Sequence, residues 1–179
     1  MKTVEHQLSN YKSVHFNKNN IKTHFIGIPL IILAITVLLS LNQFTINLAD
    51  NLLTFTPAIA LYTIALLYYF KLHIKLGFGM LLYLVVNIYL ASLISALEHA
   101  LWLALLVFVL GWIIQFIGHI YEKAKPAFFD DIMGLVIGPL FLMAEVYFAF
   151  GFEKKLHEDI TPMAIEKRKA LEKKKKELA

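Results

Sequence analysis

The chain of 179 residues is 59% hydrophobic and has a formal net charge of +4. Soluble domains are only about half apolar, so this excess indicates a membrane protein. The chain contains no cysteine, which excludes disulfides, thiolate metal sites and cysteine nucleophiles.

Five apolar runs follow one another, each close to the roughly 20 residues that a helix needs to cross the hydrocarbon core. They cover residues 25–41, 52–70, 76–97, 101–121 and 132–150. The first run follows a mostly polar segment and lacks a small-residue cleavage site. We therefore expect it to be retained as a span and not removed as a signal peptide, with the mature chain beginning at Met1.

The basic residues of the connections predict the orientation, because cytoplasmic loops are enriched in lysine and arginine. The segments after the first and third runs contain none. The N-terminal segment and the second and fourth connections each contain two or more lysines. A cytoplasmic N-terminus with four crossings satisfies this pattern.

The fifth run carries helix-weakening residues. Pro139 removes a backbone donor and Gly138 lowers helix propensity further. A full crossing would also carry the basic tail to the far side. We therefore predict an all-α integral membrane bundle of four transmembrane helices plus a broken or re-entrant fifth hydrophobic segment, with five full spans as the alternative. Glu145 lies in this run, and we expect it to pair with another group and hold the segment in place.

Residues 153–179 form a charged tail with nine basic and six acidic residues. Its composition predicts a solvated cytoplasmic helix that lies against anionic headgroups. It lacks the aromatic residues of a nucleic-acid surface, so we expect no nucleic-acid partner. The domains predicted are a membrane-embedded domain over 1–152, including the N-terminal histidine segment, and this tail over 153–179. A bacterial inner membrane and an endoplasmic reticulum membrane both fit the sequence.

The fourth run carries one polar stripe. Gln115, His119 and Glu122 recur at helical spacing, and Gly118 permits close approach of another backbone. We expect this stripe to face protein. His119 and Glu122 also have the i, i+3 spacing of helical metal ligands, although an interfacial hydrogen-bonded pair has the same spacing.

His15 and His24 stand at the cytoplasmic entrance of the first run. Tyr11 and His15 are four residues apart, as are Asn20 and His24. A turn near residues 17–20 would bring both histidines to one site. Alternatively, they anchor a polar segment at the headgroups. Imidazoles with a carboxylate would suit Fe(II), Mn or Zn.

Three blocks of sequence together resemble the Mpo-type 2-hydroxy fatty acid dioxygenases, membrane enzymes of fatty-acid α-oxidation in phytosphingosine breakdown. The blocks are "YKSVHFNKNNIKTHFIGIPL", "WIIQFIGHIYEKAKPAFFDD" and "LVIGPLFLMAEVYFAF". The resemblance implies an Fe(II) enzyme with His15, His24 and His119 as catalytic, metal-site histidines. Glu122 lies in the second block, and we assign it as a further metal ligand.

The resemblance also implies the reaction, in which O2 cleaves C1 from a long-chain 2-hydroxy fatty acid. The products are CO2 and an acid one carbon shorter. We expect Asn20, Gln115, Lys22 and Lys123 to contact this substrate, with its acyl chain among membrane lipids. Two alternatives remain, namely a non-enzymatic scaffold or small transporter, and a membrane-embedded zinc hydrolase.

Overall fold

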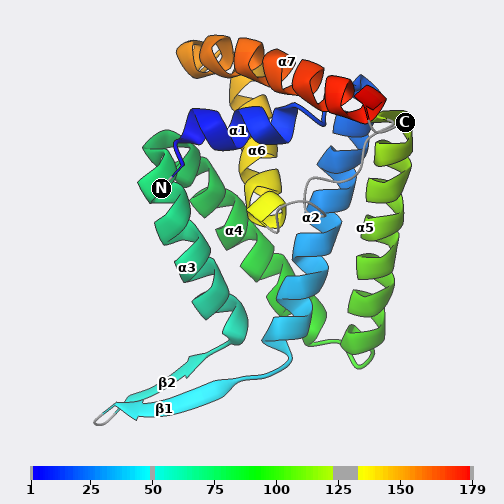
Figure 1. Ribbon diagram of the computed structural model, residues 1–179. Helices are drawn as coiled ribbons and strands as arrows, with labels where there is room; N and C mark the ends of the chain where they lie inside the picture. The colour runs from blue at the N-terminus through cyan, green and yellow to red at the C-terminus, as the bar shows by residue number, and fades with distance from the viewer. Residues whose placement is uncertain (1, 49–50, 123–132, 178–179) are drawn as a thin grey trace. The chain divides into compact units, whose positions relative to one another are not determined.

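The computed structural model describes residues 2–48, 51–122 and 133–177 and divides the chain into two compact units. One unit comprises Met1–Phe25 and Gln115–Ala179, and the other comprises Ile26–Ile114. Helices α2 (Lys18–Ser40) and α5 (Ala100–Glu122) contribute residues to both units. The prediction of a helical protein is confirmed, since helices make up nearly all of its regular structure (Figure 1).

The unit Ile26–Ile114 also contains α3 (Pro57–Leu72) and α4 (Ile74–Ser95), separated only by His73. The His73 side chain accepts a hydrogen bond from Leu76 N and so caps the start of α4. Because the connection is one residue long, α3 and α4 pack against each other. In the core of this unit, Val37 of α2 packs with small residues of α4 and α5, namely Ala91, Ala100 and Ala104.

A β-hairpin that the sequence analysis did not predict connects α2 and α3. Strands β1 (Phe44–Leu48) and β2 (Asn51–Phe55) pair antiparallel, with Phe44 opposite Phe55 and Thr45 opposite Thr54. Aromatic and β-branched residues favour such cross-strand pairs. The prediction that residues 52–55 belong to the second apolar helical run was wrong, because they belong to strand β2.

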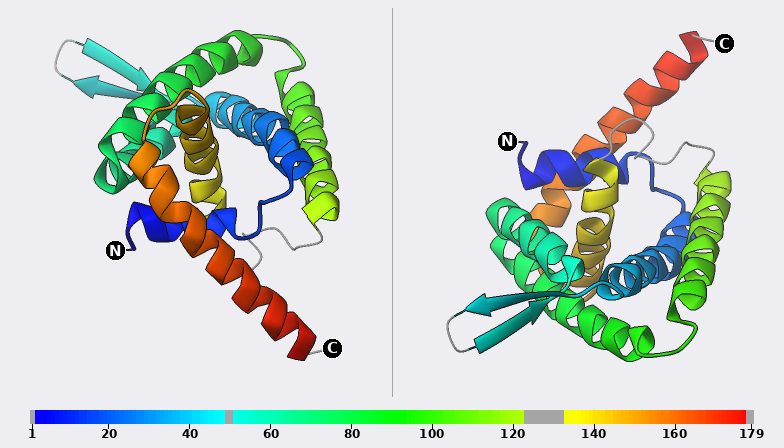
Figure 2. Two further views of the ribbon diagram at one scale, coloured as in Figure 1. Left: turned by 90° about the horizontal axis from the view of Figure 1, so that it is seen from above. Right: turned by 90° about the horizontal axis from the view of Figure 1, so that it is seen from below.

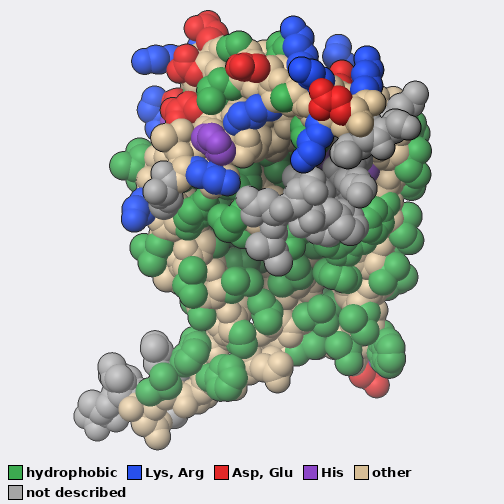
Figure 3. Space-filling model, viewed as in Figure 1, with side chains coloured by type: hydrophobic (Ala, Val, Ile, Leu, Met, Phe, Trp, Pro, Cys, Tyr) green, Lys and Arg blue, Asp and Glu red, His purple; other side chains and the backbone are tan. Residues whose placement is uncertain are grey.

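Within the described part of the chain, three helices are long and apolar enough to cross a membrane, namely α2, α4 and α5. Helices α3 and α6 (Met133–Ala149) are apolar but shorter. Large hydrophobic side chains of the unit Ile26–Ile114 are widely exposed, and Figure 3 shows them over most of the viewed face of that unit. An exposed apolar surface of this extent is typical of contact with lipid.

The other unit contains α1 (Val4–Lys12), α6 and α7 (Lys154–Glu177). Both α6 and α7 pack against α1, which is visible from two directions in Figure 2. The charged tail is helical, as predicted, and one face of it is occupied by contacts with α1. Charged side chains gather over α7 in Figure 3.

The expectation that the fifth hydrophobic segment breaks at Pro139 was wrong. Helix α6 continues through Pro139, so the fifth hydrophobic segment is not broken there. The missing N–H removes only one hydrogen bond from the helix, and neighbouring packing outweighs that loss. Helix α2 likewise continues through a proline, Pro29.

Gly118 allows α2 and α5 to approach closely, as its place in the polar stripe predicted. A Cβ atom at Gly118 would lie 2.6 Å from Asn20 Oδ1 and would also collide with the Thr23 hydroxyl. Glycine is therefore needed at this position so that the first turns of α2 can lie against α5.

Gly118→Ala is expected to push these segments apart and lower the stability of the folded protein by about 1–3 kcal/mol, the usual cost of overpacking. The measurement is thermal unfolding of the detergent-purified protein. Ile120→Ala, which truncates an exposed residue two positions away on the same helix, is the control and should leave the unfolding temperature nearly unchanged. Equal unfolding temperatures for the wild type and Gly118→Ala would contradict the close contact.

Candidate metal centre

Three buried histidines converge in the unit that contains both chain ends. His15 lies in the turn after α1, His24 in α2 and His119 near the end of α5. Their side chains are 1%, 3% and 8% exposed, and one ring nitrogen from each lies within 4.8 Å of the others. The rings meet edge to face, with centroids 4.6 to 5.1 Å apart.

The turn that joins the first two histidines follows from the local sequence. Helix α1 ends at Lys12, and Ser13 Oγ donates to the Asn10 carbonyl at that end. Asn17 then begins the next helix, because its side-chain oxygen accepts from Asn19 N at 2.9 Å. A break in the helix between the histidines is thus present, but it lies at residues 15–17, whereas Lys18 to Asn20, where the sequence suggested the turn, already belong to α2.

Two backbone carbonyls orient the imidazoles of His15 and His24. His15 Nδ1 lies 2.6 Å from the Tyr11 carbonyl oxygen, and His24 Nδ1 lies 2.8 Å from the Asn20 carbonyl oxygen. A carbonyl oxygen only accepts, so each Nδ1 carries the proton. The Nε2 atoms are then unprotonated and lie 3.1 Å apart. A histidine that donates Nδ1–H to a carbonyl and presents Nε2 is the usual arrangement of a metal ligand.

The protonation state of His15 also suits metal binding. Burial lowers the pKa of His15 well below its ordinary value, the nearby imidazoles of His24 and His119 lower it further, and the hydrogen bond to Tyr11 opposes the shift. The Tyr11 ring lies flat against His15 with ring centroids 4.1 Å apart. His15 is therefore neutral near pH 7, with the lone pair of Nε2 available to a cation.

The Glu122 carboxylate lies beside the histidine cluster, and both of its oxygens accept hydrogen bonds. One oxygen accepts from Asn17 N at 2.8 Å and from Asn20 Nδ2 at 3.1 Å, and the other accepts from Arg168 Nη1 at 3.1 Å. Glu122 is 4% exposed. The carboxylate thus ties the start of α2 to the end of α5, and through Asn20 it reaches the carbonyl that orients His24.

The polar stripe of the fourth run faces protein, as predicted, since Gln115, His119 and Glu122 are all buried. Gln115 Oε1 and Asn20 Oδ1 are buried acceptors that have no hydrogen-bond partner among the described residues. Lys22 is exposed on α2. Lys123 lies outside the described residues.

Two ion pairs complete the surroundings of the cluster. Glu145 of α6 pairs with Lys12 of α1 at 2.7 Å, which confirms the expectation that Glu145 would have a partner. Arg168 of α7 pairs with Glu122, and its Nη1 also lies within reach of the Ser13 carbonyl. The sequence analysis missed Arg168 because it lies in a run of charges that resembles a solvated face. One signal was available, since Arg168 is the only arginine in the chain, and buried carboxylates favour arginine over lysine.

Comparison with known proteins gives one family and one curated relative. Residues 1–150 match the family described as Mpo1-like, 2-hydroxy-palmitic acid dioxygenase Mpo1-like. The relative is the 2-hydroxy-palmitic acid dioxygenase MPO1 of Saccharomyces cerevisiae, which is 30% identical over 158 residues covering 84% of this chain and 83% of the yeast protein. No solved structure matches the chain.

Arg168→Ala is expected to weaken metal binding by roughly tenfold or more, the range seen when a group that orients metal ligands is removed. The reason is that the buried Glu122 carboxylate loses its charged partner and the start of α2 is less firmly held. Equilibrium dialysis against Fe(II) under nitrogen measures the change. Arg168→Lys should restore part of the affinity, because it retains the charge.

Lys173→Ala is the matched control on α7, because the Lys173 side chain is 81% exposed and pairs with Glu177 on the same helix. Its Fe(II) affinity should equal that of the wild type. If Arg168→Ala and Lys173→Ala bound Fe(II) equally tightly, Arg168 would have no role in holding the centre.

Proposed function

Because the chain belongs to the Mpo1-like family, we propose that it is a 2-hydroxy fatty acid dioxygenase with an Fe(II) centre held by His15, His24 and His119. The observation that carries the proposal is the pair of facing Nε2 atoms. Two imidazole lone pairs 3.1 Å apart repel each other unless a cation lies beside them. Three imidazoles form a nitrogen donor set that suits Fe(II) and leaves coordination positions open.

The reaction converts a long-chain 2-hydroxy acid and O2 into an acid one carbon shorter, CO2 and water. All atoms balance, and the substrate itself supplies the four electrons that O2 accepts. No nicotinamide or 2-oxoglutarate is required. Bound Fe(II) supplies Lewis acidity toward the carboxylate and hydroxyl of the substrate and a site for O2.

The chain's own residues hold this centre and keep it dry. The carbonyls of Tyr11 and Asn20 fix the proton of each imidazole on Nδ1 and leave Nε2 for the ion. Tyr11 and Phe141 pack on His15 and exclude water from one side. We assign Gln115, whose buried Oε1 has no hydrogen-bond partner in the described part of the chain, to the substrate hydroxyl.

Asn20 and Glu122 take positioning roles in this proposal. The backbone carbonyl of Asn20 accepts from His24, and its Nδ2 donates to Glu122. The Glu122 carboxylate is occupied by three donors. The proposal therefore narrows the ligand set to the three histidines, and the two other residues orient them. Lys22 and Lys123 stay predicted contacts of the substrate carboxylate.

We infer the membrane placement from the packing of α1 against α7, which supports both chain ends lying on one side. On that basis an even number of the helices between them would cross. The three long apolar helices supply three crossings, and α3, with 16 residues or about 24 Å at ~1.5 Å per residue, supplies the fourth in a slightly thinned bilayer. The basic residues favour the cytoplasm for both ends.

The test is a product assay under defined metal and oxygen. Purified protein is supplied with Fe(II), O2 and 2-hydroxypalmitic acid, and mass spectrometry follows the 15-carbon acid expected from the 16-carbon substrate. Product is expected only with both Fe(II) and O2. His119→Ala should lose at least ~100-fold in rate, since it removes one of three ligands. His99→Ala removes an exposed histidine outside the cluster and should retain activity.

Folded, iron-loaded protein that forms no shortened acid would contradict the substrate assignment. Product formation without O2, or with Zn(II) in place of Fe(II), would contradict the dioxygenase and favour a hydrolytic centre.

A further inference from the structure

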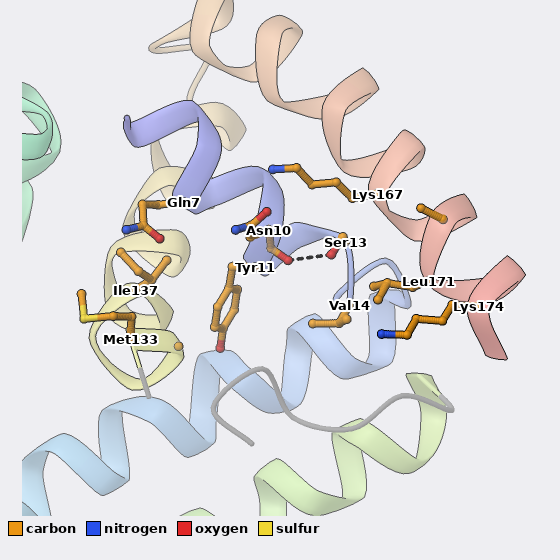
Figure 4. A pocket seen from close by; sticks show the side chains of 12 residues that line it. Gln7, Asn10, Tyr11, Ser13, Val14, Met133, Ile137, Lys167, Leu171 and Lys174 are labelled. Atoms are coloured by element: carbon orange, nitrogen blue, oxygen red, sulfur yellow. Dashed lines mark hydrogen bonds between the residues drawn. The ribbon is translucent and has the colours of Figure 1, made fainter. Parts of the chain in front are cut away.

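A cavity of about 420 Å³ lies among α1, α6 and α7, in the same unit as the histidine cluster. Figure 4 shows side chains of all three helices around it. Its volume is within the range of about 300–1,000 Å³ typical of small-molecule sites. The reaction proposed above does not use it.

The lining of the cavity combines an apolar floor with positive charge. Apolar surface comes from Val14, in the turn after α1, and from Met133 and Ile137 of α6. Helix α7 supplies two lysines, Lys167 and Lys174, which lie seven residues apart and so share one face of the helix. Among the described residues that line the cavity, none is acidic. This combination matches a ligand with an alkyl chain and an anionic head.

Hydrogen bonds to α1 hold the Lys167 side chain in place. Its ammonium group donates to Ser9 Oγ at 2.7 Å and to the His6 carbonyl at 3.3 Å. Neither acceptor carries a formal charge, so the positive charge is not neutralised by them. Burial and the charge of Lys2 lower the pKa of Lys167, and the charge of Glu166 opposes this shift. A carboxylate bound beside Lys167 would favour its charged form further.

Tyr11 connects this cavity to the histidine cluster. Its side chain contributes to the cavity wall, and its ring lies flat on His15. Ser13 and Val14, which also line the cavity, lead directly into His15. A molecule in the cavity is therefore one aromatic ring away from the cluster but not in contact with His15 itself.

We propose that this cavity is a second site for a long-chain carboxylate, which holds the acid apart from the reacting position before or after turnover. The carboxylate lies between Lys167 and Lys174, and the chain lies over Val14, Met133 and Ile137. Substrate and product both combine a carboxylate with an alkyl chain. The identification of the ligand as a fatty acid rests on the proposed function. The site binds the carboxylate and the alkyl chain and does not distinguish acids with a 2-hydroxyl group from acids without one.

The experiment is photo-crosslinking with palmitic acid that carries a diazirine at its chain end. Metal-free protein in lipid nanodiscs is labelled under nitrogen, so no turnover occurs and binding is measured independently of iron chemistry. Peptide mass spectrometry is expected to locate the label on α6, at Met133 or Ile137. Excess palmitate and 2-hydroxypalmitate should suppress labelling to the same extent, and hexadecanol, which lacks the carboxylate, should not.

Lys167→Gln combined with Lys174→Gln should lower this labelling by roughly tenfold, because both charge-assisted hydrogen bonds are lost. The matched control is Lys173→Gln combined with Lys176→Gln, which removes two exposed charges from the same helix away from the cavity. Lys174→Glu alone, at an exposed position, should reduce labelling without affecting folding.

The proposal is overturned if hexadecanol competes as well as palmitate, if only 2-hydroxypalmitate competes, or if the control pair reduces labelling as much as the cavity pair. Failure of the product assay with successful labelling would leave the carboxylate site standing, whereas active enzyme with no label on α6 would remove the second site alone.

Discussion

The facing imidazoles of His15 and His24 are the constraint on which the surrounding structure depends. Each ring is fixed by a hydrogen bond to the carbonyl four residues earlier, and the two Nε2 lone pairs are held 3.1 Å apart. A cation beside these lone pairs would offset their mutual repulsion, which is the basis of the proposed metal centre. The turn before α2, the glycine at position 118 and the buried Glu122 carboxylate all serve to hold these rings in place.

Two ion pairs join the helices that surround the cluster. Lys12 and Glu145 connect α1 to α6, and Arg168 and Glu122 connect α7 to α5. Buried pairs add little net stability, but removal of one partner leaves an uncompensated charge, which is costly. The two ion pairs therefore fix the positions of these helices more than they stabilise the folded protein. Helix α7 lies beyond the residues that match the family, yet its arginine reaches the carboxylate next to the cluster.

The sequence was informative where spacing and burial determine structure. Helical periodicity correctly predicted that Gln115, His119 and Glu122 share one buried face. His15 and His24 are nine residues apart and would lie on opposite faces of one unbroken helix, so a break between them was expected and is present. The sequence was uninformative where contacts between distant segments determine the structure. The partner of Glu122 is Arg168, 46 residues away, and Pro139 remains helical because packing outweighs a local loss. The role of the three histidines as metal ligands stays a prediction.

X-ray absorption spectroscopy of the Fe(II)-loaded protein tests the metal centre most directly, because imidazole rings give multiple scattering that carboxylates do not. The account predicts three imidazole ligands on iron in the wild type, two in His119→Ala, and an unchanged three in Glu122→Gln. A spectrum fitted by fewer than three imidazoles, or one that His119→Ala leaves unchanged, would contradict the centre described above.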